Sequence, residues 1–368
     1  VILGHLTILI WINILLKFIS EKKIVFWILL VLFSPLLGVG SIIVTPDIPL
    51  LFFLSLSLLF SIQIFEDHKL LNYFFLGLSL GLGFISKYHT VLFIPLLLIN
   101  LILNKNYKNI RIKGVLITIV TGLIFSLPVL IWNFQNDFRS FAFQLDHGLA
   151  QKNWEPFWTY SYLVGQLIII FPTILYLALT RGYKKKESLI FLSAWFPLVF
   201  FLTSSFKGPV EPNWAIMSLA PIFALAIFNL HKNIYLYLSY IFWGIFNIFV
   251  MTQVYFSIFE NVPEKMNEAR YFDEIKPIVT EYSPIYFGSY QMASKIWYET
   301  KMPTKKLLHI NRADFFDELN PFPPTEKSFY IIKETWVPIP DWLNSNEFKL
   351  SKIKNVGEKF ELIVVSKL

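Results

Sequence analysis

Two short polar segments interrupt the apolar N-terminal half of the chain and carry side chains capable of ionic chemistry. Thr45-Pro46-Asp47 and Ser86-Lys87-Tyr88-His89 each lie between two apolar runs. Asp47 has two open interpretations: part of a helix start with Thr45 as N-cap, or a functional carboxylate at a membrane–water boundary. Lys87 either complements a helix C-terminus and snorkels or binds a lipid phosphate.

Two later segments add further candidates for a binding site. The segment 133–156 predicts a long loop containing Asp146 and His147, and the segment 207–214 predicts a rigid turn containing two prolines and a glycine. A histidine beside an aspartate does not make a metal site, which needs three or four converging ligands. The turn contributes a cation, a carboxylate, an amide and an indole: Lys207, Glu211, Asn213 and Trp214.

Several motifs for soluble donors are missing from the sequence. It has no Gly-x-x-x-x-Gly-Lys loop for a nucleotide phosphate, no Asp-x-Asp pair for a nucleotide-sugar metal, and no cysteine. Gly77, Gly81 and Gly83 fit a close helix contact of small residues. If the chain is a transferase, we expect a lipid-borne donor and no cofactor, with a divalent metal left open.

Composition places these segments in a membrane protein. Of the 368 residues, 55% are hydrophobic and only 15% are charged, against about 25% charged in soluble domains. Because soluble cores stop growing at roughly 250–300 residues, the apolar excess must face lipid. The net charge of +7 falls in short clusters between apolar runs, which favours a bilayer over a nucleic acid as partner.

Apolar runs of about 20 residues predict membrane-spanning helices. Ten runs qualify: 1–19, 24–44, 46–65, 71–86, 90–103, 114–133, 157–180, 188–206, 212–230 and 234–257. One set of connecting segments holds most basic residues: Lys17, Lys22, Lys23, Lys69, Lys105, Lys108, Arg111, Lys113, Arg181, Lys184, Lys185, Lys186 and Lys232. The other set has only Lys87, Arg139, Lys152 and Lys207. Basic segments stay cytoplasmic, so the second set is predicted to face outward.

The last part of the chain changes character. Residues 258–368 hold 15 of the 32 basic and 16 of the 25 acidic residues. Short apolar pieces at 285–287, 329–332 and 362–365 predict strands, and 290–299 and 313–319 predict helices. We therefore expect an all-α polytopic membrane bundle, residues 1–257, followed by a small extracytoplasmic α/β domain, residues 258–368.

The order of these motifs resembles that of a known family. Ser34-Pro35 with Val44-Thr45-Pro46-Asp47-Ile48-Pro49-Leu50, the glycine-rich stretch 77–83 leading into Ser86-Lys87-Tyr88, and the segments 143–148, 165–166 and 207–214 are similar to bacterial glycosyltransferases with the GT-C fold. These are relatives of protein O-mannosyltransferases and lipid A aminoarabinose transferases. Ser289-Tyr290-Gln291-Met292-Ala293 resembles a helix of that family's outer domain.

The resemblance implies inverting transfer of a sugar from a polyprenyl-phosphate donor to a hydroxyl of a glycolipid, glycan or protein. In that family an acidic pair ahead of the position of Val1 supplies the catalytic base, and the present chain is expected to be a fragment or a truncated remnant. The implied roles are a supporting carboxylate for Asp47 and phosphate binding for Lys87 and Lys207. The implied substrate contacts are Tyr88, His89, Asp146, His147, Glu211, Asn213 and Trp214.

Two other functions fit a chain with many spans. A transporter or flippase for lipid-linked glycans should place charges in mid-span and often shows two similar halves, neither of which is evident here. A non-catalytic membrane scaffold would bind a partner through residues 258–368. The expected location is the inner membrane of a bacterium, where such an enzyme would serve synthesis of the cell envelope.

Overall fold

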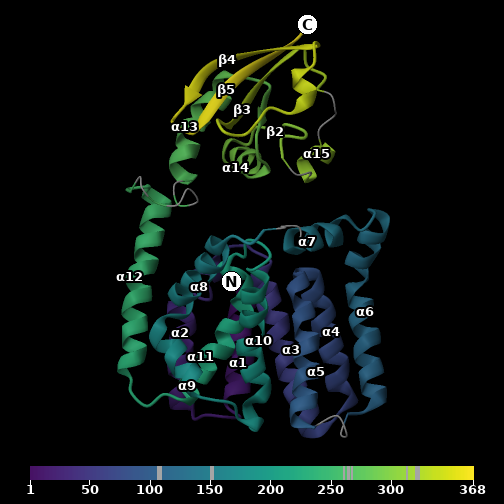
Figure 1. Ribbon diagram of the computed structural model, residues 1–368, viewed down its shortest axis with the longest axis vertical. Coiled ribbons are helices and arrows are strands. Elements are labelled where there is room, and N and C mark those ends of the chain that lie inside the picture. Colours follow the sequence, from purple (N-terminus) through teal and green to yellow (C-terminus); the bar gives the residue numbers. More distant parts are fainter. Residues whose placement is uncertain are drawn as a thin grey trace. The chain divides into compact units, whose positions relative to one another are not determined.

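The structure, a computed structural model, describes residues 1–105, 110–149, 153–259, 262, 266, 268–311, 314–319 and 324–368, with the side chains of 145–149 and 268–270 left undescribed (Figure 1). The chain divides into two compact units, Val1–Asn247 and Ile248–Leu368. The boundary falls inside the helix α12.

The first unit is entirely helical where it is described. Its α-helices are α1 Ile2–Leu15, α2 Glu21–Phe33, α3 Asp47–Asp67, α4 Leu70–Ser86, α5 Phe93–Asn104, α6 Ile112–Gln135, α7 Arg139–Leu149, α8 Pro156–Ile170, α9 Pro172–Thr180, α10 Ser188–Ser204, α11 Leu219–Phe228 and the start of α12 Ile234–Phe256. Short 3-10 helices are η1 Val39–Ile42, η2 Tyr88–Leu92, η4 Lys185–Glu187 and η5 Pro212–Ser218. The predicted helical membrane bundle is confirmed.

The ten expected spans are not ten straight helices. Four described helices are long and apolar enough to cross a membrane: Asp47–Asp67, Ile112–Gln135, Lys185–Ser204 and Ile234–Phe256. The run 157–180 is instead α8 and α9, bent by 89° at Phe171, whose φ is +67°. Pro172 cannot donate the backbone hydrogen bond that would continue α8. The run 24–44 likewise leaves the helix at Phe33, just before Ser34-Pro35.

Helices α4 and α6 pack at very short range, with α4 lying between α3 and α6 (Figure 1). A Cβ added at Gly77 would stand 2.4 Å from a carbonyl oxygen of α6, and one at Gly81 would stand 2.6 Å from the Gly122 carbonyl. This confirms the predicted contact of small residues for Gly77 and Gly81. Gly83 faces a different neighbour, Thr90 of η2.

A buried polar network joins α5 to α10. The Asn104 amide donates to Asn100 Oδ1 and Ser188 Oγ, each at 2.9 Å, and Ser188 Oγ donates to Asn100 Oδ1 at 2.6 Å. The Tyr183 hydroxyl completes the network by donating to Asn104 Oδ1 at 2.8 Å. Asn100, Asn104 and Ser188 are all buried, so these groups satisfy one another where water is excluded.

The second unit contains a mixed sheet in the strand order β2-β1-β3-β5-β4. Its strands are β1 Ile285–Phe287, β2 Lys305–Lys306, β3 Ser328–Glu334, β4 Phe348–Val356 and β5 Phe360–Lys367, and its helices are α13 Glu268–Glu281, α14 Tyr290–Thr300, α15 Phe315–Leu319 and the 3-10 helix η7 Asp341–Asn344. Strands β2, β1 and β3 are parallel, and β5 pairs antiparallel with β3 and β4. The predicted α/β domain is confirmed, while α13, β2 and β4 were not predicted.

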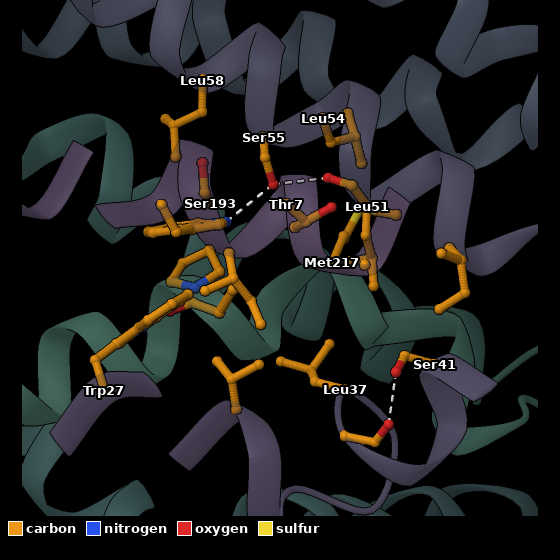
Figure 2. Close-up of a pocket in the computed structure, with 18 of the residues that line it drawn as sticks. Thr7, Trp27, Leu37, Ser41, Leu51, Leu54, Ser55, Leu58, Ser193 and Met217 are labelled. Atoms are coloured by element: carbon orange, nitrogen blue, oxygen red, sulfur yellow. Dashed lines mark hydrogen bonds between the residues drawn. The ribbon is translucent and has the colours of Figure 1, made fainter. Parts of the chain in front are cut away.

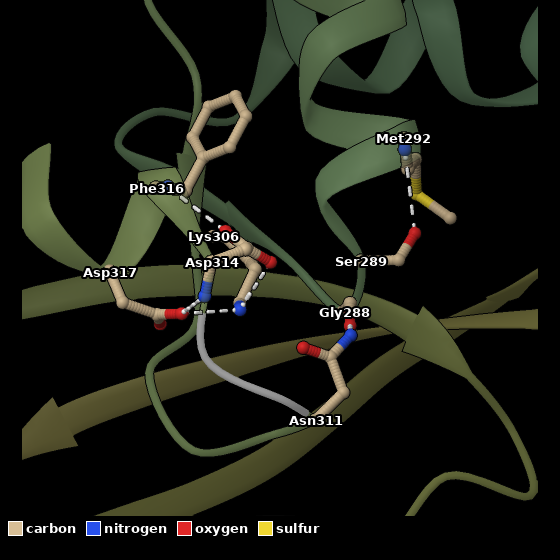
Figure 3. Close-up of polar contacts among 8 residues, drawn as sticks. All are labelled: Gly288, Ser289, Met292, Lys306, Asn311, Asp314, Phe316 and Asp317. Atoms are coloured by element: carbon tan, nitrogen blue, oxygen red, sulfur yellow. Dashed lines mark hydrogen bonds and ion pairs between the residues drawn. The ribbon is translucent and has the colours of Figure 1, made fainter. Parts of the chain in front are cut away.

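One cation is completely buried beside this sheet. The side chain of Lys306, at the end of β2, has no exposed surface, and its ammonium contacts Asp314 and Asp317 at 2.7 Å each (Figure 3). Asp317 also accepts the Asp314 backbone amide at 2.6 Å. Because a buried charge needs compensating partners, Lys306 ties β2 to the start of α15.

Candidate functional site

The side chains of Asp47 and Lys87 form an ion pair where two neighbouring helices end. Asp47 is the first residue of α3, and Lys87 follows the last residue of α4 in an extended conformation. Since α3 packs against α4 in the opposite direction, the start of one meets the end of the other. Lys87 Nζ lies 2.6 Å from Asp47 Oδ1, and the two side chains are 21% and 11% exposed.

The structure corrects one part of the interpretations left open by the sequence. The N-cap of α3 is Pro46, and no side chain caps the helix, so the prediction of Thr45 as N-cap is wrong. The Lys87 side chain does not extend into solvent, because its ammonium pairs with Asp47 and the side chain is only 21% exposed. The charge-assisted hydrogen bond to Asp47 fixes the position of the Lys87 ammonium.

A second group of candidates meets around an aromatic cluster. The His89 ring lies 5.1 Å from the Phe201 ring and 5.9 Å from the Trp214 ring, measured between centroids. Phe201 and Trp214 are themselves 5.9 Å apart. His89 Nδ1 is buried without a hydrogen-bond partner among the described residues. The structure thus brings His89 and Trp214 together, from segments more than a hundred residues apart.

The turn before η5 is fixed by contacts with α8. The Gln166 side chain donates to the Pro212 carbonyl at 2.7 Å, and a Cβ at Gly165 would stand 2.3 Å from Pro212 Cγ. Asn213 is half-buried in this turn, while Glu211 and Lys207 are exposed. In the described part of the chain, Lys207 has no ion-pair partner, so no contact joins it to Asp47 or Lys87.

Tyr88 anchors a helix that the sequence did not predict. The segment 133–156 was expected to be a loop, yet it contains α7, which begins at Arg139. The Tyr88 hydroxyl lies 2.6 Å from Ser140 Oγ, which donates to Asn133 Oδ1 at 2.7 Å. Asp146 and His147 belong to α7, but their side chains lie outside the described residues.

An apolar cavity of about 350 Å³ lies beside the first turns of α3 (Figure 2). Its wall includes Ile48 and the stacked rings of Trp11 and Trp27, whose centroids are 5.5 Å apart. Ser55 accepts the Trp11 indole N–H at 2.9 Å. Ser193 also lines the cavity, and its hydroxyl is buried without a partner among the described residues. Of these lining residues, only Ile48 belongs to a motif recognised in the sequence, because the others are spread over α1, α2, α3 and α10.

No group of three or more His, Asp or Glu side chains that could hold a metal ion occurs among the residues with described positions. The features described at this site are a carboxylate–ammonium pair, an aromatic cluster and an apolar cavity.

Comparisons with known proteins show what the chain is similar to. Residues 1–132 match the family described as dolichyl-phosphate-mannose-protein mannosyltransferase. The undecaprenyl phosphate-alpha-4-amino-4-deoxy-L-arabinose arabinosyl transferase of Serratia proteamaculans is 29% identical over 42% of this chain and 30% of its own length. The lipid A galacturonosyltransferase RgtD of Rhizobium johnstonii is 24% identical over 54% of this chain and 43% of its own length. The chain thus spans less than half of these relatives.

The likeness extends further in three dimensions. The crystal structure of ArnT from Cupriavidus metallidurans bound to undecaprenyl phosphate matches all of this chain and 83% of that chain, with a TM-score of 0.64 and 13% identity. The apo structure of the same ArnT matches with a TM-score of 0.63. The chain is therefore a multi-pass membrane protein with the fold of ArnT, and it is similar to the lipid A aminoarabinose transferase-like group of GT-C glycosyltransferases.

Proposed function

We propose that the chain is part of a membrane glycosyltransferase that moves a sugar from a polyprenyl-phosphate donor to a hydroxyl group on the extracytoplasmic face, with inversion at the anomeric carbon. The named activities of the relatives support this substrate class. The acceptor would be a glycolipid, a glycan or a protein.

The observation that carries this proposal is the Asp47–Lys87 ion pair at the end of two packed helices. In the transfer, the acceptor oxygen forms a bond to the anomeric carbon while the bond from that carbon to the phosphate oxygen breaks. The polyprenyl phosphate leaves with the electron pair, and a carboxylate takes the acceptor's proton. Lys87 would stabilise the charge that develops on the departing phosphate.

Asp47 supports this step through Lys87. It sets the position of the ammonium at 2.6 Å and partly balances its charge before the donor arrives. The base is a different carboxylate from Asp47, as the resemblance to the family implies. In this proposal Asp47 is a positioning residue for Lys87, and the two act as a unit.

The remaining candidates would meet other parts of the substrates. The apolar cavity beside Ile48 suits a hydrocarbon chain. Ser193 adds to the cavity wall a hydroxyl that has no hydrogen-bond partner among the described residues. The ring cluster of His89 and Trp214 suits a sugar face, since aromatic rings offer flat apolar surface beside polar edges. Lys207 is exposed and would meet the phosphate as it enters. Tyr88, which contacts Ser140 of α7, stays a candidate substrate contact.

The orientation proposed here puts the Asp47–Lys87 pair and the second unit on the extracytoplasmic side of a bacterial inner membrane. The basic segments support it by the positive-inside rule. The path of α12 supports it as well, because the Asn247 amide donates to the Phe33 carbonyl at 2.9 Å. Phe33 ends α2 on the rim predicted to face outward, so α12 would leave the first unit there.

We also propose that transfer needs no cofactor. A lysine can balance the charge of a phosphate monoester leaving group, whereas nucleotide-diphosphate donors commonly need a divalent ion. Transfer should therefore continue in excess EDTA at an unchanged rate. A loss of activity restored by Mg²⁺ or Mn²⁺ would contradict this part of the proposal.

The test is sugar transfer in proteoliposomes that contain the protein as the cell makes it, a polyprenyl-phosphate sugar and a glycolipid acceptor. We expect a glycosidic product whose anomeric configuration, measured by NMR, is opposite to that of the donor. Movement of the donor across the bilayer without any product would instead support a flippase. Absence of both, in a folded protein, would support a scaffold or an inactive remnant.

A further inference from the structure

A second cavity, of about 450 Å³, forms a groove along the membrane-spanning part of α4, α5 and α6. On α6 its lining follows one stripe that runs from Val115 through Ile119, Gly122 and Ser126 to Leu130. At a rise of 1.5 Å per residue this stripe is roughly 22 Å long. One leaflet of the hydrocarbon core is about 15 Å thick, so the groove accommodates a whole acyl chain.

The groove offers almost no hydrogen bonds to an occupant. The hydroxyls of Ser61, Thr118 and Ser126 each donate to a backbone carbonyl of the protein. The Tyr73 hydroxyl accepts the backbone amide of Arg111 at 3.3 Å. Thr90, near the end of the groove closest to Lys87, is the lining hydroxyl without a partner among the described residues. A hydrocarbon chain therefore fits the rest of the groove.

Two basic residues flank the lining at the opposite end. Arg111 is the N-cap of α6, next to the lining residue Ile110, and its backbone amide contacts the hydroxyl of the lining residue Tyr73. Lys105 is the C-cap of α5, which contributes Leu101 to the lining. Both are exposed, and within the described ranges neither has an ion-pair partner.

From this arrangement we propose that the groove binds an anionic phospholipid. One acyl chain lies between α5 and α6, and the phosphate contacts Lys105 and Arg111. Basic pockets between membrane-spanning helices bind anionic headgroups in this way, and arginine forms paired hydrogen bonds with a phosphate. By the orientation proposed above, this lipid belongs to the cytoplasmic leaflet.

This site is separate from the proposed transfer site. The Asp47–Lys87 pair stands at the other end of α4, and neither Lys105 nor Arg111 contacts it. The two proposals can therefore fail independently. A lipid bound at Lys105 and Arg111 would hold α5 beside α6. Among the described residues, α6 contacts the rest of the bundle mainly through α4.

The test measures binding of phosphatidylglycerol and of phosphatidylcholine with matched acyl chains to the purified protein in detergent, by native mass spectrometry. We expect phosphatidylglycerol to bind more tightly. The Lys105→Gln/Arg111→Gln variant should lose roughly tenfold to thirtyfold in affinity for phosphatidylglycerol and little for phosphatidylcholine. The matched control is Lys184→Gln/Lys185→Gln, which removes two exposed cations between α9 and α10 and should bind like the parent protein.

A second variant tests the groove itself. Gly122→Leu should fill it, since a Cβ at this position meets only the Gly77 carbonyl, at 3.5 Å, and should weaken binding of both lipids. Unchanged phosphatidylglycerol binding in the double charge variant, or an equal loss in its control, would overturn the headgroup site. Unchanged binding in Gly122→Leu would overturn the groove. Displacement of phosphatidylglycerol by equimolar polyprenyl phosphate would overturn the identity of the lipid.

Discussion

A double-mutant cycle on Asp47 and Lys87 tests whether the two residues act as one unit. Asp47→Asn keeps the shape of the side chain but removes its charge, and Lys87→Met keeps the length of the chain but removes the ammonium. The sequence had suggested separate roles, with Asp47 serving the acceptor or the base and Lys87 serving the phosphate. The structure joins them at 2.6 Å, which makes a different prediction for the double variant.

The size of the effect follows from the contact. Both side chains are largely buried, at 11% and 21% exposure, and a hydrogen bond between charged groups contributes about 1.5–3 kcal/mol. If Asp47 acts by positioning Lys87, losing this contact should lower kcat by about 10-fold to 150-fold, since 1.36 kcal/mol corresponds to tenfold in rate. Lys87→Met should lower kcat at least as much, because it removes the cation itself. The double variant should be no slower than Lys87→Met.

The assay is initial-rate transfer in proteoliposomes, with donor concentration varied to separate kcat from KM. A matched control exists on the same two helices at their other ends, where Lys69 Nζ lies 2.8 Å from Asp67 Oδ2 in an exposed ion pair. Asp67→Asn and Lys69→Met should leave kcat unchanged. Multiplicative losses in the Asp47–Lys87 double variant would refute the reasoning, because they would mean that the two side chains serve independent steps.

Three properties of the scaffold can be tested alongside. Lys306→Met should lower the free energy of unfolding of the second unit by about 3–5 kcal/mol, because Asp314 and Asp317 lose a buried cation. Hydrogen exchange of residues 285–367 in urea measures this free energy, and an unchanged value would contradict the prediction. Gly77→Leu should force α4 away from α6 and lower the melting temperature, whereas a melting temperature equal to that of the parent would argue against the close packing. Burial raises the pKa of Glu361, but Lys333 and Lys352 outweigh it and hold that pKa below its ordinary value. The contribution of Glu361 to the free energy of unfolding is therefore present above about pH 4.3 and is lost as the pH falls through the lower pKa of the folded state. Glu361→Gln should flatten the dependence of the free energy of unfolding on pH in this range, and an unaltered dependence would count against this assignment.

The sequence predicted the parts of the fold that depend on local composition. Apolar length gave the membrane-spanning character of α3, α6, α10 and α12, and short apolar pieces gave β1, β3 and β5. The sequence-based prediction was wrong where a proline ends a helix inside a long apolar run. Pro172 and the Ser34-Pro35 step end helices inside runs that are apolar enough to span.

The site was predicted as a set of residues but not as a set of contacts. Asp47, Lys87, His89 and Trp214 were all named from loop position and motif order, and the structure pairs the first two and packs the last two. Their pairing depends on which helix ends meet, which a single sequence does not reveal. The cavity wall was missed for the same reason, since Trp11, Ser55 and Ser193 look like ordinary residues of apolar helices.

The network of Asn100, Asn104, Ser188 and Tyr183 bears on how this bundle assembles. Helix α10 is long and apolar enough to cross a membrane, and α5 belongs to a shorter apolar helix; lipid alone does not distinguish one rotation or depth of a helix from another. Sliding α5 by one turn against α10 would leave these amides and hydroxyls facing hydrocarbon, where an unsatisfied polar group costs several kcal/mol. These hydrogen bonds therefore favour the observed position of α5 against α10 over positions that leave them unmade. The network thereby helps to specify which helices pack together.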